Sequence, residues 1–179
     1  MSKVNFVILA AGKGTRMRSA LPKVLHKLSG RSMLGHVVVA VESLGEAKKI
    51  IVTGHGAQQV EQQFKSPTTI FTQQKEQLGT GHAVQMAIPE LCSDAVVIVL
   101  YGDVPLIRPA TIKKVLGVVT ESTMGLLTIH LEEPQGYGRI VRDINGDITE
   151  IVEQKDASAE QLQITEVNTG VLALRASQL

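Results

Sequence analysis

The stretch FVILAAGKGTRMRSALP, residues Phe6–Pro22, decides the fold of this chain. Its apolar run Phe6–Leu9 ends at two alanines, and Gly12 and Gly14 follow. A continuous apolar run is typical of a buried parallel strand, whose two faces are both covered. Small residues after such a strand let a ligand approach the backbone and leave successive N–H groups free for an anion.

Positive side chains gather in the same turn and just beyond it, at Lys13, Arg16, Arg18 and Lys23. Free backbone N–H groups and clustered cations at the carboxyl end of a strand are the chemistry of a polyphosphate site. The stretch therefore predicts a strand that delivers a phosphate-binding loop.

Three other interpretations of this turn are possible. The Walker A pattern needs GxxxxGK followed by Ser or Thr, and this turn lacks that spacing. The dinucleotide fingerprint GxGxxG fits Gly12 and Gly14, but its third position falls on Met17. The remaining alternative is an ordinary glycine-rich strand-to-helix turn with solvated lysines.

Composition narrows the class of protein. The 179 residues are 44% hydrophobic and 20% charged, which suits one core-forming domain. A net charge of +1 and only 3% aromatic residues argue against a nucleic-acid partner. The lone cysteine fits a reducing compartment, and no apolar run is long enough for a membrane span, so we expect a cytoplasmic protein without a membrane partner.

Apolar runs alternate with helical periodicity over the first 131 residues. This alternation predicts an α/β fold, Rossmann-like, with a mainly parallel mixed sheet and helices on both faces. Asn145-Gly146 then signals a hairpin, so the later part is expected to be mixed or antiparallel. The expected strands are 4–10, 49–53, 69–72, 95–101, 125–131, 138–142, 148–152 and 166–174; the expected helices are 33–44, 57–64, 82–88 and 109–119; 24–29 is expected to be extended.

Ligands on such sheets bind beyond the carboxyl ends of the strands, where Asp103 follows the most apolar strand, 95–101. Its carboxylate is the best placed to hold Mg²⁺, which proteins bind through one or two carboxylates together with substrate phosphates. The alternative for Asp103 is a turn or helix cap. The histidines show no metal-ligand spacing, and only His82 is expected to line the site.

Several motifs together resemble a known family. LAAGKGTRM at 9–17 with PKVL at 22–25 is similar to the signature of sugar-nucleotide pyrophosphorylases, which other nucleotidyltransferases share. EQLGTGHAV at 76–84, YGDVPL at 101–106, GYGRIVR at 136–142, IVEQKDA at 151–157 and EVNTG at 166–170 narrow the resemblance. They resemble the N-terminal uridyltransferase domain of the bacterial bifunctional N-acetylglucosamine-1-phosphate uridyltransferases.

The resemblance implies roles for matching residues. Arg16, Lys23 and Asp103 would be catalytic, with Asp103 as the ligand of the Mg²⁺ cofactor. Gln74, Gly79 and Thr80 would read uracil. The sugar would be held by Gly138, Glu153 and Asn168. The complete substrate-binding set is Leu9, Ala10, Ala11, Gly12, Lys23, Gln74, Gly79, Thr80, Tyr101, Gly102, Asp103, Gly138, Glu153 and Asn168.

The implied reaction transfers UMP from UTP to N-acetylglucosamine 1-phosphate and gives UDP-N-acetylglucosamine and pyrophosphate. It would serve cell-envelope precursor synthesis, for peptidoglycan and lipopolysaccharide. Residues 1–179 would form a single domain, with a nucleotide-binding part at 4–131 and a sugar-binding part at 132–179.

The family's enzymes are longer, so the chain is expected to be a C-terminally truncated domain. The missing part would carry a second metal-binding Asn, acetyltransferase activity and trimer contacts, so this chain is expected to be a monomer. Three alternatives stay open: nucleotide binding without turnover, transfer to another sugar phosphate, and an NAD-dependent oxidoreductase.

Overall fold

The computed structural model describes residues 3–179, with Arg16 described by its backbone alone. It contains two compact units. The first runs up to Gly125 and includes Leu172–Leu179, and the second is Leu126–Val171. Strand β10 (Glu166–Arg175) belongs to both units, because the division falls within it.

The first unit is built on a mainly parallel sheet in the order β5-β4-β1-β6. Its strands are β1 (Val4–Ala10), β4 (Lys48–Thr53), β5 (Thr69–Gln73) and β6 (Val96–Tyr101). The end of β10 pairs antiparallel with β6, with Leu174 opposite Val97. The predicted α/β class and its mainly parallel mixed sheet are confirmed. The runs in β1, β4 and β6 are apolar because both faces of the sheet are covered there.

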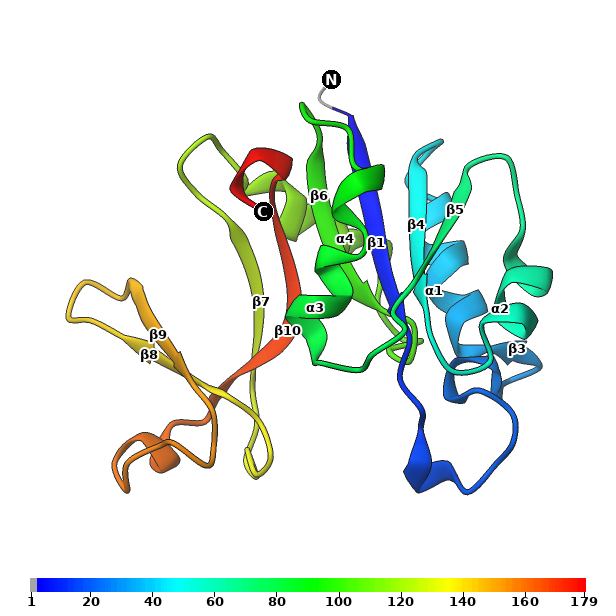
Figure 1. Ribbon diagram of the computed structural model, residues 1–179. Helices are drawn as coiled ribbons and strands as arrows, with labels where there is room; N and C mark the ends of the chain where they lie inside the picture. Colours follow the sequence, from blue (N-terminus) through cyan, green and yellow to red (C-terminus); the bar gives the residue numbers. More distant parts are fainter. Residues whose placement is uncertain (1–2) are drawn as a thin grey trace. The chain divides into compact units, whose positions relative to one another are not determined.

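Helices lie on both faces of this sheet, as Figure 1 shows with α3 in front of β1 and β6 and α1 and α4 behind. Alternate residues of β1 point to opposite faces, and Val7 and Leu9 pack with Ala83 and Ala87 in one core cluster. The helices are α1 (Met33–Glu42), α2 (Ala57–Phe64), α3 (Thr80–Gln85) and α4 (Pro109–Gly117).

The register brings the carboxyl ends of the parallel strands to one edge. Ala10 lies opposite Thr53, Leu9 opposite Tyr101, and Thr53 opposite Gln73. The turns that leave these strands therefore start side by side, as expected for a ligand site on an open parallel sheet.

The second unit is antiparallel. Strands β8 (Arg139–Arg142) and β9 (Ile148–Val152) form the hairpin that Asn145-Gly146 predicts, with a register shift between Val141 and Arg142. The first part of β10 pairs with β8, and β7 (Gly125–His130) pairs with β10. Ile140, Val152, Val167 and Val171 are its buried apolar residues.

Two expectations about local structure were wrong. Residues 24–29 are not extended throughout, because Lys23–Leu25 forms a 3₁₀ turn. Within this range only Lys27–Leu28, the short strand β2, is a strand, and it pairs with the short strand β3 (Arg31–Ser32). The helix expected at 82–88 is α3, which ends at Gln85, and a separate 3₁₀ turn covers Ile88–Glu90. Pro89 lies inside that turn, where a continued helix would lack its N–H.

The compact units differ in their bounds from the functional parts expected at 4–131 and 132–179, because the last eight residues belong to the first unit. The division into nucleotide-binding and sugar-binding parts stays a prediction. Within residues 3–179, every helix is too short or too polar to cross a bilayer.

Candidate functional site

A cavity of about 330 Å³ lies at the carboxyl ends of β1 and β6 in the first unit. Its lining combines small backbone-exposing residues with an amine, a carboxylate, a phenol and two amides. The lining residues are Leu9, Ala10, Ala11, Gly12, Lys23, Val24, Gln74, Gln77, Gly79, Thr80, Ala83, Tyr101 and Asp103. The structure thus brings together most of the nucleotide-side residues that the sequence singles out.

The glycine-rich loop is shaped so that Lys23 can approach it closely. Gly14 has a φ of +58°, and its carbonyl accepts a hydrogen bond of 2.8 Å from the Met17 N–H. A Cβ on Gly14 would lie 2.7 Å from Lys23 Cβ, closer than real Cβ contacts come. Glycine is needed here both for its backbone conformation and for the space that Lys23 occupies.

Lys23 and Asp103 form an ion pair in this cavity, with 2.6 Å between Lys23 Nζ and Asp103 Oδ2. Lys23 comes from the turn after the loop, and Asp103 comes from the turn after β6, so the pair joins segments 80 residues apart. Both side chains are partly exposed, at 35% and 30%. A pair so placed is available to ligands and contributes little to folding.

Two glutamine side chains shape the edge of the cavity. Gln77 Nε2 donates to the Ala11 carbonyl over 2.7 Å, which ties the polar loop 74–79 to the end of β1. Gln74 is buried, and its Nε2 lies 3.0 Å from the Gly79 carbonyl and 3.2 Å from His82 Nδ1. His82, the histidine expected to line the site, is not in the cavity lining. It contacts the site only through Gln74.

Tyr101 supplies a hydroxyl that stays protonated. Burial is the main cause that raises the pKa of Tyr101 above its ordinary value of 10.0, and the nearby Asp103 carboxylate acts in the same direction. A hydrogen bond with the Thr80 side chain lowers this pKa, by less than burial raises it but by more than Asp103 does. The Tyr101 hydroxyl can therefore donate a hydrogen bond in this cavity at neutral pH.

Besides His82, two predicted residues of this unit are not in the cavity lining. Gly102 donates its N–H to the Leu9 carbonyl over 2.9 Å, and a Cβ on it would come 3.2 Å from Leu34 Cδ1. The side chain of Arg16 lies outside the described residues, so its role stays a prediction.

Sequence reasoning assigned no role to three lining residues, Val24, Gln77 and Ala83. Gln77 and Ala83 fall inside the quoted motif at 76–84, so their place in it was the available signal.

The three predicted sugar-side residues lie together in the second unit. A Cβ on Gly138 would be 3.4 Å from Glu153 Oε1, and the Gly138 carbonyl accepts a 2.9 Å hydrogen bond from the Asn168 N–H. The Asn168 side chain accepts from the Gly170 N–H over 2.8 Å, which fixes its orientation. The cluster offers a carboxylate and an amide beside a residue with no side chain.

The divalent metal that the sequence resemblance implies finds only part of its donors in this site. Asp103 provides one carboxylate, and its Oδ2 already lies against a cation, the Lys23 ammonium. Among the described residues, no three His, Cys, Asp or Glu side chains gather as a metal site. This arrangement suits a metal held by one carboxylate together with substrate phosphates.

The fold and the cavity define the class of protein. The chain is similar to a UDP-glucose pyrophosphorylase complexed with UDP-glucose, with a TM-score of 0.77 and 18% identity over 98% of this chain and 76% of that chain. It is also similar to a putative glucose-1-phosphate thymidylyltransferase from Bacillus anthracis, with a TM-score of 0.78 and 17% identity over 97% of this chain and 72% of that chain. The fold is therefore the Rossmann-like nucleotidyltransferase fold.

The chain belongs to the family described as the MobA-like NTP transferase domain, whose model matches residues 6–143. It is 53% identical over 176 residues to the "Bifunctional protein GlmU" of Cellvibrio japonicus (strain Ueda107). It is 52% identical over 176 residues to the protein of the same name from Burkholderia ambifaria (strain MC40-6). Each match covers 98% of this chain and 39% of the relative, so the chain spans about two fifths of these proteins' length.

Proposed function

We propose that this chain transfers UMP from UTP to N-acetylglucosamine 1-phosphate and releases pyrophosphate. The observation that carries the proposal is the Lys23–Asp103 pair, which lies in one cavity with the glycine-rich loop and the Gln74 amide. The Lys23 amine and the glycine-rich loop can bind a polyphosphate, and the Gln74 amide can form hydrogen bonds with a base. The likeness to the GlmU proteins supports the choice of sugar phosphate.

In the proposed reaction a phosphate oxygen of N-acetylglucosamine 1-phosphate attacks the α-phosphorus of UTP in line. The new P–O bond forms as the bond to the bridging oxygen breaks, and pyrophosphate leaves with that electron pair. The nucleophile is already an anion, so no general base is required. The protein then has to position two anions and neutralise their charge.

Lys23 and Asp103 would divide this work. The Lys23 ammonium would bind phosphate oxygens, either in place of its ion pair with Asp103 or together with it. Arg16 is proposed to act beside it. Asp103 would hold Mg²⁺, which when bound supplies positive charge against the phosphates. Gly12 and the neighbouring backbone would contact the phosphates, because a residue without a Cβ allows close approach.

The sugar moiety is proposed to bind at Gly138, Glu153 and Asn168. Glu153 would accept hydrogen bonds from sugar hydroxyls, and Asn168 would use its amide. The resulting UDP-N-acetylglucosamine would serve cell-envelope precursors, including peptidoglycan and lipopolysaccharide.

Pyrophosphate release tests this function directly. The unmodified chain is mixed with UTP, N-acetylglucosamine 1-phosphate and Mg²⁺, and glucose 1-phosphate replaces the sugar phosphate in a parallel reaction. Release that needs UTP and is fastest with the N-acetylated sugar supports the proposal, and faster release with glucose 1-phosphate favours another sugar phosphate. Titration calorimetry with UTP and NAD separates the alternatives, because binding of UTP without release would indicate a nucleotide-binding module.

A further inference from the structure

We propose that His82 is a positioning residue that fixes the Gln74 amide, so that Gln74 Oε1 faces the cavity and selects a base with an N–H donor. The inference rests on the proposed function, because it concerns base selection in the same nucleotide site. It adds to that function a residue that touches no substrate and yet decides which base fits.

The Gly79 carbonyl decides which way the Gln74 amide lies. The amide atom 3.0 Å from Gly79 O must be the NH₂ nitrogen, since two carbonyl oxygens would repel each other there. The same carbonyl also accepts from the Ala83 N–H over 3.2 Å at the start of α3. Loop and helix therefore share this acceptor, and the amide nitrogen is directed toward α3.

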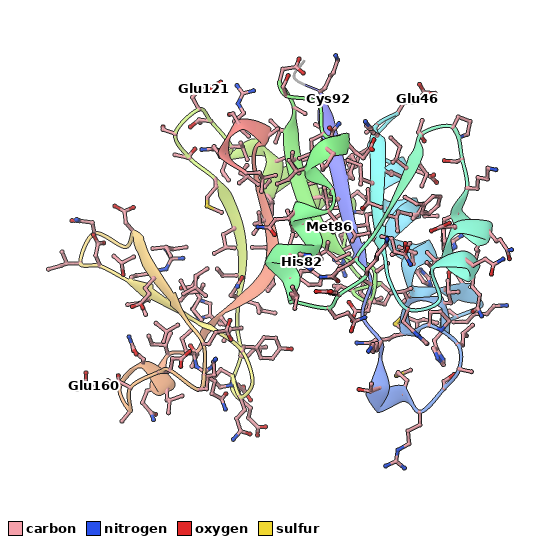
Figure 2. All side chains as sticks on the ribbon, viewed as in Figure 1. Glu46, His82, Met86, Cys92, Glu121 and Glu160 are labelled. Carbon is pink, nitrogen blue, oxygen red and sulfur yellow. The ribbon has the colours of Figure 1, made fainter. Side chains whose placement is uncertain are left out.

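The second hydrogen of that NH₂ group meets His82. Gln74 Nε2 lies 3.2 Å from His82 Nδ1, and an amide nitrogen only donates. Nδ1 must therefore carry the lone pair, and the ring proton is on Nε2. Figure 2 places His82 on α3, one turn before Met86.

The consequence for the cavity is that only the carbonyl end of the amide is left for a ligand. Gln74 lines the cavity, and among the described side chains and backbone groups none donates to its Oε1. With both amide hydrogens bonded within the protein, the side chain offers an acceptor and no donor. Uracil presents an N–H at N3 and satisfies this acceptor, whereas cytosine presents a lone pair at N3 and leaves two acceptors facing each other.

His82 matters because one bond leaves the amide free to move. Gln74 is 5% exposed, so an unbonded amide hydrogen there has little access to water. Without an acceptor at position 82, one amide hydrogen is unbonded and only the hydrogen bond to the Gly79 carbonyl restrains the amide, so the oxygen points less steadily at the base. Leaving one buried polar group unpaired changes an equilibrium by roughly tenfold to a hundredfold.

The test combines a spectroscopic measurement with base preference. The ¹⁵N chemical shifts of the His82 ring report which nitrogen carries the proton, in the unmodified chain without nucleotide. Pyrophosphate release and calorimetric affinity are then compared for UTP and CTP in the unmodified chain, His82→Phe and His82→Asn. Phenylalanine keeps the ring but lacks an acceptor, whereas asparagine places Oδ1 where Nδ1 was. Gln85→Ala, an exposed change on the same helix, is the matched control.

The expected results are a lone pair at Nδ1 and a UTP preference that falls about tenfold or more in His82→Phe. His82→Asn should restore the preference, and Gln85→Ala should not change it. A proton on Nδ1, or an unchanged preference in His82→Phe, would overturn the inference. Failure of the proposed function looks different: no variant would release pyrophosphate or bind either nucleotide, while the ¹⁵N shifts would still show whether His82 holds Gln74.

Discussion

At the scale of single residues, the Lys23–Asp103 pair gives the most direct prediction. Asp103→Asn removes the carboxylate proposed to hold Mg²⁺ and should reduce pyrophosphate release by a factor of roughly a hundred or more. The melting temperature should hardly change, since a partly exposed ion pair contributes little to folding. Asp94→Asn, at an exposed carboxylate, is the control. Full turnover of Asp103→Asn at saturating Mg²⁺ would contradict this role.

Lys23→Ala should act differently from the carboxylate variant. It removes the amine proposed to bind phosphate in both the ground and transition states, so both KM for UTP and kcat should change. Lys113→Ala removes the same charge at an exposed position of α4, away from the cavity. Its KM and kcat should equal those of the unmodified chain. A raised KM with an unchanged kcat would show that Lys23 binds the nucleotide but does not stabilise the transition state further.

Glu166 in the second unit gives a prediction about pH. Hydrogen bonds from Arg142 are the main cause that lowers the pKa of Glu166 from 4.5 to about 2, and Thr128 adds to this. Because the folded pKa is below the unfolded one, the stabilisation is complete above about pH 4.5 and is lost as the pH falls toward 2.

Glu166→Gln should therefore cost about 1 kcal/mol of unfolding free energy at pH 7, a modest value because Arg142 is 39% exposed. The difference from the unmodified chain should shrink below pH 4.5. Denaturant unfolding at several pH values measures it, with Glu150→Gln on the exposed strand β9 as control. A difference in unfolding free energy that grows as the pH falls would show that the Arg142–Glu166 pair is not its cause.

At the scale of elements, the turn after β4 packs against the glycine-rich segment 11–23 at two points. A Cβ on Gly54 would lie 2.6 Å from the Ala11 carbonyl oxygen, and one on Gly56 would lie 2.3 Å from Pro22 Cγ. Gly56 also has a φ of +71°. The turn thus touches the loop just before Gly12 and just before Lys23, and a side chain at either glycine must move the loop.

Gly54→Ala and Gly56→Ala should each lower stability by roughly 1–3 kcal/mol through this overpacking. They should also weaken UTP binding more than their stability loss explains, which calorimetry below the melting temperature measures. Gly117→Ala is the matched control, because a Cβ there meets nothing within 4 Å and its φ is ordinary. Unchanged UTP affinity in both loop-facing variants would show that the loop position does not matter for binding.

The same elements show what the sequence predicts and why. Strands β1, β4 and β6 of the first unit were predicted because each contains an apolar run that ends at small or polar residues. The turn at Lys23–Leu25 was missed because one 3₁₀ turn has no periodicity to detect.

Contacts between distant segments could not be predicted from periodicity. Gln77 reaches the Ala11 carbonyl across 66 residues, and Gly54 packs on the same Ala11. Both contacts depend on which strands are neighbours in the sheet. The residues predicted to bind the sugar came from the family resemblance, because Asn168 taken alone is typical of an ordinary turn.

At the scale of the whole molecule, strand β10 gives a prediction about cooperativity, because the boundary between the two compact units falls within it. Leu172–Arg175 pair with β6, and Ala173 is fully buried in the first unit. Val167 instead pairs with Arg139 of β8, whose hairpin partner β9 is exposed over its first four residues. If each unit opens by itself, the two ends of one strand should exchange their amide hydrogens at different rates.

Hydrogen exchange followed by NMR should therefore show protection that changes near residue 171. The amides of Leu172–Leu174 should follow β6, which is buried on both faces, and those of Val167 and its neighbours should follow the less protected β8–β9 hairpin. Glu166→Gln should speed exchange in the second group only, since the Arg142–Glu166 pair lies within the second unit. Uniform protection along β10, or acceleration of both groups together, would mean that the molecule opens as one cooperative unit, so that a destabilising mutation in the second unit would also destabilise the first.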